Sequence, residues 1–329
     1  MLLTGAAANG LEVSTDMARR KPGFDLPHDN GRFDGAARER RTLLASIPAS
    51  ESAVLRALYD GAGGRNWIRR NGWLTSSNEC TWEGISCDTQ GSHVLRINLI
   101  ANNLRGSLPG ELFSSLPKLQ QLTVSGNSIQ GELPSFAGSG ALLAVDLANN
   151  QFGGSIPSFD GLTQLQFFSA YSNQLTGSIP SLTGMTNLAA LDVSENQLTG
   201  SIPSLAGLTS LQGLEVDDNQ LTGSIPLLNG LTDLQFFYAQ LNRLTGPIPS
   251  LAGLPNLRYF RVGFNRLSGS APAAPSSGTL ASGASNLCPN LFDTTPSPND
   301  FAWNAATGIF PWWGEHGGRC DILFEGGFD

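Results

Sequence analysis

Two carboxylates are the residues of this sequence with the clearest capacity for chemistry. Asp192 and Glu215 lie 23 residues apart, at the same position of two consecutive copies of a repeated segment. On neighbouring repeats, their carboxyl groups would approach the separation of about 5 Å that retaining glycosidases use. Any repeat of this length brings equivalent residues together, so the spacing alone does not indicate catalysis. The sequence contains no G-x-S-x-G, P-loop or H-E-x-x-H motif, and we expect no catalytic residues and no cofactor.

A second candidate chemistry is cation binding by acidic residues near the middle of the chain. These residues are Glu195, Glu215, Asp217 and Asp218, and their carboxylate oxygens are ligands that Ca²⁺ accepts. Acidic neighbours on a solvated surface are also common in proteins that bind no metal. We therefore expect no metal site, with weak calcium binding as the alternative.

The four cysteines are divided between the two ends of the repeated region. Cys80 and Cys87 precede it, whereas Cys288 and Cys320 follow it. Zinc sites usually show a Cys-x-x-Cys pair or nearby histidines, and neither cysteine pair has this spacing. We predict one disulfide at each end, with metal binding as the alternative. Disulfides persist in oxidising compartments, which indicates an extracellular, cell-surface or periplasmic protein.

Charge and hydropathy exclude two classes of partner. The chain carries 19 basic and 27 acidic residues, a net charge of −8, whereas nucleic-acid binding needs clustered Lys and Arg. No apolar run approaches the roughly 20 residues that span a bilayer, so we expect no integral membrane segment. Residues 1–10 lack the basic and apolar regions of a secretory signal, which suggests a truncated or mis-assigned start. Residues 1–48 are predicted to form a disordered leader or linker.

Eight asparagines set the period of the repeated region. They are spaced once by 25 residues and then always by 23, and such a period indicates a solenoid. They are Asn102, Asn127, Asn150, Asn173, Asn196, Asn219, Asn242 and Asn265. Each asparagine amide can donate to and accept from the backbone of adjacent turns, so we predict an asparagine ladder along the solenoid.

The residues before each asparagine predict which side of a strand is buried. The pattern is L-x-x-L-x-L-x-x-N, as in "LAALDVSEN", where Leu188, Leu191 and Val193 point inward and Asp192 points outward. One strand cannot bury its apolar side alone, so adjacent repeats stack their strands into a parallel sheet. Residues 93–272 are therefore predicted to form eight repeats.

The segment after each asparagine carries a resemblance to a known family. L-T-G-x-I-P stands at residues 175–180, 198–203, 221–226 and 244–249. This motif resembles that of plant-specific leucine-rich repeat proteins, which include polygalacturonase-inhibiting proteins and receptor-kinase ectodomains. The resemblance implies an α/β leucine-rich repeat fold: a right-handed curved solenoid with a concave parallel sheet and a second, short strand layer on its flank. The chain has no N-x-S/T glycosylation site, which favours a non-plant, bacterial relative.

Both ends of the repeats are predicted to carry caps. Residues 49–92 resemble the Trp-rich, two-cysteine cap of the same family, with a short helix that Ser50 would cap. Its tryptophans, Trp67, Trp73 and Trp82, would cover the edge of the first repeat. Residues 273–329 are predicted to form a linker and a second cap. The aromatic side chains that would seal it are Trp303, Phe310, Trp312 and Trp313, with sugar stacking by an exposed Pro-Trp-Trp segment as the alternative.

The outward strand positions vary most among the repeats and form the predicted binding surface. They grade from small polar residues, through an acidic centre, to aromatic and basic residues. Tyr, Phe and Arg are enriched in binding hot spots. Phe167, Phe236 and Phe264 together would form a large apolar patch. The predicted ligand-binding residues are Phe167, Tyr171, Asp192, Glu215, Asp217, Phe236, Tyr238, Tyr259 and Arg261.

We expect a monomeric, secreted module that binds a protein, or a cell-wall polysaccharide, on this concave sheet. Resemblance to the polygalacturonase inhibitors makes enzyme inhibition one form of this function. The alternative is a glycan or ice-surface binder that uses a row of identical side chains, Thr176, Thr199, Thr222 and Thr245. A glycan-active enzyme built on Asp192 and Glu215 is the remaining hypothesis.

Overall fold

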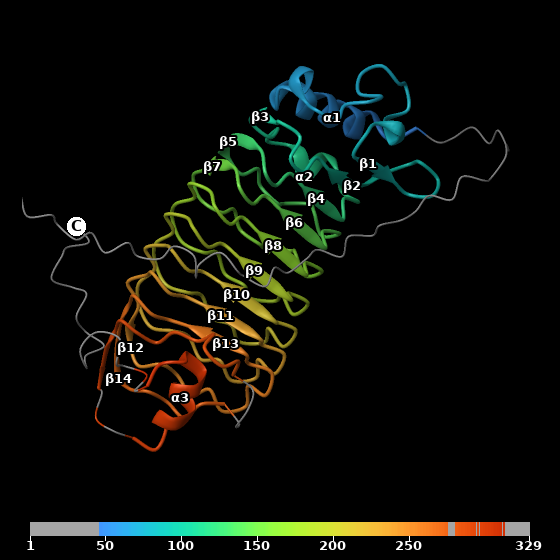
Figure 1. Cartoon of the computed structure of the whole chain (residues 1–329). Helices are drawn as coiled ribbons and strands as arrows, with labels where there is room; N and C mark the ends of the chain where they lie inside the picture. Colours follow the sequence, from blue (N-terminus) through green and yellow to red (C-terminus); the bar gives the residue numbers. More distant parts are fainter. Residues whose placement is uncertain (1–45, 276–279, 294, 296, 311, 313–329) are drawn as a thin grey trace, which may run out of the picture. The chain divides into compact units, whose positions relative to one another are not determined.

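The computed structural model describes residues 46–275, 280–293, 295, 297–310 and 312. Its main element is a nine-stranded sheet in which the chain adds one parallel strand per repeat, as the asparagine spacing predicts (Figure 1). The first strand comes from the amino-terminal cap and is antiparallel to its neighbour. In spatial order the strands are β1 (Ile85–Cys87), β2 (Val94–Asn98), β4 (Gln121–Thr123), β6 (Ala144–Asp146), β8 (Phe167–Ser169), β9 (Ala190–Asp192), β10 (Gly213–Glu215), β11 (Phe236–Tyr238) and β13 (Tyr259–Arg261).

Shorter strands form the second layer that the family resemblance implied. They make two three-stranded parallel sheets, and isolated bridges such as Ser178 with Thr199 connect the repeats between them. The first sheet contains β3 (Arg105–Gly106), β5 (Ser128–Glu132) and β7 (Gln151–Gly153). The second contains β12 (Thr245–Gly246), β14 (Arg266–Ser270) and β15 (Leu291–Asp293).

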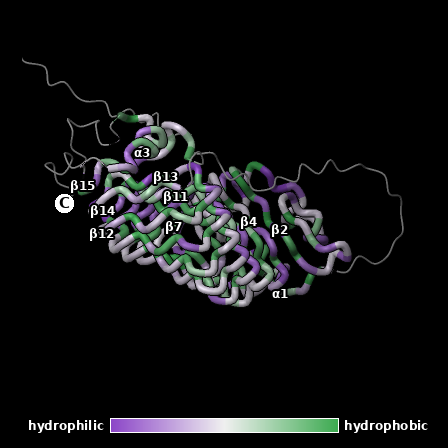
Figure 2. Tube along the Cα trace, turned by 90° about the horizontal axis from the view of Figure 1, so that it is seen from below, coloured by the Kyte–Doolittle hydropathy of each residue, from purple (hydrophilic) through white to green (hydrophobic). Residues whose placement is uncertain are grey.

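Apolar side chains at the repeat period fill the interior of the solenoid. Leu188, Leu191 and Val193 are at most 1% exposed, which confirms their predicted inward positions. Hydrophobic residues recur along successive turns of the chain (Figure 2). The short helix α2 (Leu112–Ser115) adds Phe113, whose buried ring lies near other interior aromatic rings. Each fully buried Leu or Val contributes roughly 1.5–3 kcal/mol, so the repeats stabilise one continuous core.

The asparagine after each strand forms the predicted ladder. Oδ1 of Asn196 accepts a hydrogen bond from the backbone N–H of Leu175 at 2.9 Å. Its Nδ2 donates to the carbonyl oxygen of Ala170 in the preceding repeat and to that of Ser194 in its own turn, both at 3.0 Å. Each asparagine therefore joins two repeats through backbone groups that need partners in the interior.

A ninth asparagine extends the ladder beyond the predicted repeats. Oδ1 of Asn290 accepts from the backbone N–H of Leu267 at 2.9 Å, and its Nδ2 donates to the carbonyl of Val262 at 2.8 Å. This segment was predicted to be a linker. In the structure it instead adds one irregular turn to the solenoid. Its asparagine follows Asn265 by 25 residues and lacks the full leucine pattern, so the 23-residue period did not reveal it.

A tryptophan cluster covers the first repeat. Trp67, Trp73 and Trp82 are at most 3% exposed, and the ring centroids of Trp73 and Trp82 lie 4.7 Å apart. Tyr59 of helix α1 (Ala49–Gly61) packs against the rings of Trp67 and Trp73. The short 3-10 helices η1 (Gly64–Asn66) and η2 (Glu79–Thr81) directly precede Trp67 and Trp82. The cluster hides the apolar interior that the first repeat would otherwise expose.

Helix α1 begins differently from the prediction. Ser50 lies inside the helix, and Pro48 is the residue before its first turn, without a side-chain cap. The carbonyl oxygen of Pro48 accepts the first hydrogen bond of the helix, from the backbone N–H of Ser52 at 3.0 Å. Glu51 makes the polar contacts instead: it is 1% exposed, its Oε2 accepts from the backbone N–H of Val94 at 2.8 Å, and its Oε1 lies 2.6 Å from Nδ1 of His93. This carboxylate attaches the cap helix to the sheet.

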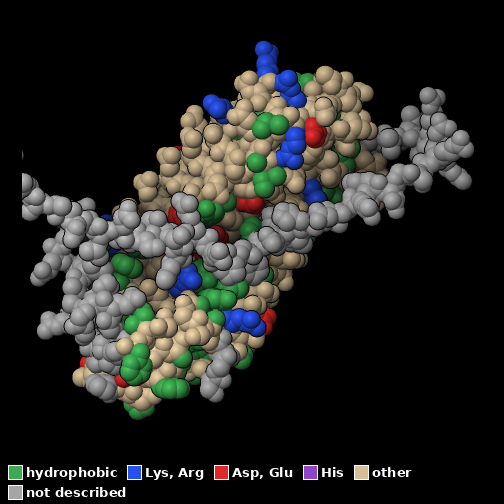
Figure 3. Space-filling view, in the orientation of Figure 1, with side chains coloured by type: hydrophobic (Ala, Val, Ile, Leu, Met, Phe, Trp, Pro, Cys, Tyr) green, Lys and Arg blue, Asp and Glu red, His purple; other side chains and the backbone are tan. Residues whose placement is uncertain are grey.

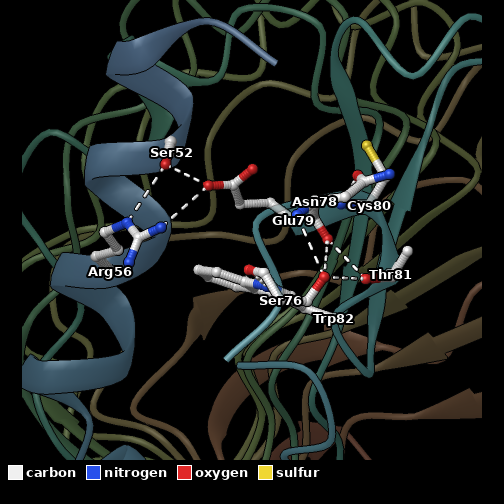
Figure 4. A network of polar contacts seen from close by, with 8 residues as sticks. All are labelled: Ser52, Arg56, Ser76, Asn78, Glu79, Cys80, Thr81 and Trp82. Carbon is white, nitrogen blue, oxygen red and sulfur yellow. Dashed lines mark hydrogen bonds and ion pairs between the residues drawn. The ribbon is translucent and has the colours of Figure 1, made fainter. Parts of the chain in front are cut away.

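A polar network and a disulfide hold the loop that follows the cap helix. Oγ of Ser52 donates to Oε1 of Glu79 at 2.5 Å, and Nη2 of Arg56 lies 3.3 Å from the same oxygen (Figure 4). Cys80 and Cys87 form the predicted amino-terminal disulfide. The cap is therefore fixed covalently as well as by its tryptophans.

Two of the predicted aromatic side chains cover the carboxy-terminal end of the repeats. Trp303, in helix α3 (Asp300–Thr307), is fully buried, and its ring centroid lies 6.1 Å from that of Phe260. Trp312 is 2% exposed, so its ring is not available for stacking on a sugar. Phe310 is 85% exposed and does not contribute to the seal, in contrast to the prediction.

Several predictions concern residues outside the described ranges. Cys320 and Trp313 are among these residues, so the pairing of Cys288 with Cys320 stays a prediction. The same holds for a disordered leader, which falls almost entirely on residues 1–45. Within the ranges that the structure describes, no helix is both long enough and apolar enough to cross a membrane.

Candidate functional site

Strand register brings the predicted outward residues into two rows across the nine-stranded sheet. The first row contains Ser169, Asp192, Glu215, Tyr238 and Arg261. The second contains Phe167, Ala190, Gly213, Phe236 and Tyr259. We call the surface formed by these rows the outer sheet face. Adjacent strands lie about 4.8 Å apart, so consecutive members of a row are near neighbours.

Four of the predicted residues form one aromatic cluster on β11 and β13, namely Phe236, Tyr238, Tyr259 and Arg261. The rings of Phe236 and Tyr259 are stacked, with centroids 5.2 Å apart and planes inclined by 14°. The ring of Tyr238 meets that of Phe236 edge-on at 6.3 Å, and the guanidinium of Arg261 lies 4.9 Å from the Tyr238 centroid. Basic side chains lie beside hydrophobic ones over this part of the solenoid (Figure 3). The cluster thus combines apolar ring faces with one guanidinium charge.

Tyr238 is the most buried member of the aromatic cluster. It is 1% exposed, and burial raises the pKa of its phenol to about 12; Arg261 opposes this rise, whereas Glu215 adds to it. The phenol therefore stays neutral throughout the physiological pH range.

The acidic residues lie next to the aromatic cluster and are less exposed than predicted. Glu215 is 8% exposed and Asp217 is 5% exposed, because larger side chains from the adjacent strand pack beside them. Nε2 of Gln240 donates to Oδ2 of Asp217 at 3.0 Å, and Tyr238 lies opposite Glu215. A cation that contacts these carboxylates would be attracted more strongly than at a fully solvated surface.

Asp192 continues the acidic part of the outer sheet face by one strand. It is half-buried, and Oγ of Ser194 donates to its Oδ1 at 2.6 Å. The side chain is therefore oriented by its own turn.

Two predicted anchors do not join the aromatic cluster. Phe167 is separated from Phe236 by two strands, which place the small residues Ala190 and Gly213 between them. Tyr171 lies in the turn after Phe167's strand, on the same side of this gap. The predicted apolar patch is therefore divided into two parts rather than continuous.

The carboxy-terminal turn supplies a contact that the sequence analysis missed. Nε of Arg261 donates to the carbonyl oxygen of Ala284 at 3.0 Å. The backbone N–H of Val262 donates to the carbonyl oxygen of Asn286 at 2.8 Å. This turn orients Arg261 toward Tyr238. This contact could not be predicted, because residues after 272 lack the repeat pattern.

The alternative cation site is not assembled. In the part of the chain with described coordinates, no three His, Cys, Asp or Glu side chains are grouped so that they could hold a metal ion. Glu195 and Asp218 are exposed, whereas Glu215 and Asp217 are buried. The four acidic residues therefore differ in environment and do not converge on one point.

The alternative threonine row lies on the flank and is exposed. Thr176, Thr199, Thr222 and Thr245 each donate their hydroxyl hydrogen to a glycine carbonyl of the preceding repeat, at 3.1–3.4 Å. These hydroxyl hydrogens are used within the solenoid, so the row offers mainly methyl groups and acceptor lone pairs to a ligand.

The parallel sheet, the asparagine ladder and the flank strands together define a leucine-rich repeat solenoid. No model of a known protein family matches the chain. A segment of 70 residues is 40% identical to receptor-like protein 35 of Arabidopsis thaliana and covers 20% of this chain and 7% of that protein. The curated relatives are much longer: the matched segments of two of them span 7% and 15% of their lengths.

Solved ectodomains of plant receptor kinases share this fold. That of GASSHO1/SCHENGEN3 from Arabidopsis thaliana, in complex with CASPARIAN STRIP INTEGRITY FACTOR 2, has a TM-score of 0.61 and 33% identity, covering 66% of this chain and 27% of that chain. The Arabidopsis HAESA ectodomain, in complex with an IDA peptide hormone ligand, has a TM-score of 0.61 and 29% identity, covering 78% and 44%.

A plant ice-binding protein has a TM-score of 0.53 and 22% identity, covering 78% of this chain and 92% of that chain. At this identity the similarity shows the fold alone. The expectation of a non-plant, bacterial relative has no support in these comparisons.

Proposed function

We propose that this leucine-rich repeat module binds an extended segment of a protein or peptide on its outer sheet face. The similar ectodomains of GASSHO1/SCHENGEN3 and HAESA were solved with a factor and a peptide hormone bound, which supports a protein-binding module. This chain covers less than half of each of those chains, so the chemistry of its partner follows from the residues of its own outer sheet face.

The observation that carries the proposal is the aromatic cluster on β11 and β13. Stacked Phe236 and Tyr259 and the Arg261–Tyr238 pair stand on adjacent strands of one sheet. Aromatic and arginine side chains dominate binding energy at protein interfaces. Their fixed geometry means that little conformational entropy is lost when a partner docks.

The neighbouring carboxylates favour a basic partner segment. Asp192, Glu215 and Asp217 lie on one side of the aromatic cluster, whereas Arg261 lies on the other. A peptide with an apolar or aromatic residue over Phe236 and Tyr259, followed by Lys or Arg, would match this order. A partner with the opposite charge order would place like charges together.

Two further properties belong to this proposal. We propose an extracellular or cell-surface location, which the Cys80–Cys87 disulfide and the similarity to receptor ectodomains support. We also propose that the module acts by stoichiometric binding rather than turnover, as the similarity to receptor ectodomains suggests.

The experiment that tests the proposal is selection from a displayed library of random dodecapeptides on the purified chain. Selected peptides are then titrated against a triple variant with Phe236→Ala, Tyr259→Ala and Arg261→Ala. A matched flank variant carries Thr176→Ala, Thr199→Ala and Thr222→Ala, and so keeps the same number of substitutions.

We expect basic peptides with an apolar anchor, whose affinity falls by about a hundredfold in the triple variant and stays unchanged in the flank variant. Equal loss in both variants, or loss in the flank variant alone, would contradict binding on the outer sheet face. The second result would favour the threonine row.

A further inference from the structure

The flank of the first repeats contains a notch that belongs to neither the outer sheet face nor the core. It has a volume of about 480 Å³, within the range of about 300–1,000 Å³ that is usual for small-ligand sites. Its lining comes mainly from β3, β5 and β7, which are neighbours in one sheet, and from the last residue of helix α1. Figure 1 shows where these elements lie. Its lining residues are Gly61, Gly106, Ser107, Gln130, Gly131, Gln151, Gly153 and Gln174. We call this hollow the flank notch.

A missing side chain opens the flank notch. Gly153 occupies the position at which later repeats place Thr176, Thr199, Thr222 and Thr245. A Cβ atom at Gly153 would meet only the carbonyl oxygen of Gln174, at an ordinary contact distance of 3.9 Å, and its φ is not in the left-handed region. The local backbone therefore accepts a larger residue there, and glycine leaves the space open.

Gly106, also in the flank notch, shows the contrasting case. Its φ is 104°, and a Cβ atom would approach the carbonyl oxygen of Gly61 to 2.1 Å. Glycine at this position is required for the close packing of the cap helix against β3. Among the glycines that line the flank notch, only Gly153 has neither a positive φ nor a close contact at the Cβ position.

The lining of the flank notch selects a class of ligand. It contains no charged, aromatic or aliphatic side chain, which disfavours ions and apolar ligands. Gln130, Gln151 and Gln174 are exposed, and no hydrogen bond within the described part of the chain uses their side-chain amides. Each amide offers donors and an acceptor, which matches hydroxyl groups that also donate and accept.

We infer that the flank notch binds a short, neutral oligosaccharide. The three glutamine amides hydrogen-bond its hydroxyl groups, while the glycine backbone at Gly131 and Gly153 lets a sugar ring approach closely. The site lies on a different strand layer from the outer sheet face, so the inference does not depend on the proposed function.

Isothermal titration calorimetry tests the inference with three neutral probes, cellotetraose, laminaritetraose and mannotetraose, and with tetragalacturonate as the charged counterpart. The decisive variant is Gly153→Thr, which installs the residue of the later repeats. Its new hydroxyl would have the carbonyl of Gly131 as acceptor, as Thr176 has that of Gly154, so the variant should fold and melt as the natural chain does.

We expect at least one neutral probe to bind the natural chain and tetragalacturonate to bind more weakly. Gly153→Thr should reduce the affinity by about tenfold or more, as should Gln151→Ala combined with Gln174→Ala. Gln197→Ala, the same repeat position outside the notch, is the matched control and should bind normally. The Phe236, Tyr259 and Arg261 triple variant should also bind normally.

Two results would overturn the inference. The first is that none of the neutral probes binds the natural chain. The second is that Gly153→Thr binds the probe as well as Gln197→Ala does.

Discussion

Tyr238 is a phenol that the fold keeps away from water while surrounding it with charged groups. Its burial raises its pKa to about 12, against an ordinary value of about 10. Because the folded-state pKa is raised, the associated stability is fully present below about pH 10. It is lost as the pH rises from there toward about 12, since the unfolded chain ionises first.

We therefore expect the phenol of Tyr238 to ionise only near pH 12 in the folded chain. Ultraviolet titration of the natural chain and of Tyr238→Phe should differ by a phenolate signal with a midpoint near pH 12. In urea unfolding, the loss of stability between about pH 10 and pH 12 should be smaller in Tyr238→Phe. If the two titrations differed by a phenolate signal with a midpoint near pH 10, the phenol of Tyr238 would be solvated, contrary to this prediction.

At the scale of elements, the asparagine ladder is the device that holds one repeat to the next. Asn196 satisfies backbone groups of two repeats at once. We expect Asn196→Ala to lower the free energy of unfolding by about 2–3 kcal/mol, because several buried backbone groups lose their partners. The measurement is urea unfolding followed by circular dichroism.

The neighbouring residue provides the control for this prediction. Gln197 is exposed, so Gln197→Ala should change the free energy of unfolding by no more than about 0.5 kcal/mol. Similar losses in the two variants would mean that the ladder contributes no more than a surface amide.

The amino-terminal cap is a second element whose stability can be tested. The Cys80–Cys87 disulfide closes a loop with a sequence separation of 7. Replacing both cysteines by serine should lower the free energy of unfolding by about 2 kcal/mol, because the unfolded cap gains conformational freedom. Thermal unfolding of the double variant checks this, and a melting temperature equal to that of the natural chain would contradict the stapling role.

At the scale of the whole molecule, the periodic features of the fold could be predicted from the sequence. The asparagine spacing indicated one strand per repeat, and alternation around Leu191 indicated its buried side, because both depend on local pattern. The irregular turn at Asn290 could not be predicted, since its spacing breaks the period. The helix start after Pro48 was missed because serine, unlike proline, is a common capping residue, which made Ser50 the expected cap.

The arrangement of the candidate binding surface could be predicted only in part. The strand register follows from the repeat length, so the row from Asp192 to Arg261 was predictable. Phe167 and Phe236 are separated because two intervening strands carry the small residues Ala190 and Gly213 at the same position. The predicted apolar patch took no account of these two residues. The burial of Glu215 depends on side-chain packing between repeats, and no periodic signal reports it.

Hydroxyl-radical footprinting of the chain with and without a selected peptide tests the central claim most directly. Phe236 and Tyr259 are half-buried members of the aromatic cluster, whereas Phe301 and Phe310 are 84% and 85% exposed and lie outside it. If the outer sheet face binds the partner, oxidation of Phe236 and Tyr259 will fall on peptide binding, while that of Phe301 and Phe310 will not change. Unchanged oxidation of Phe236 and Tyr259 in the saturated complex would contradict the claim.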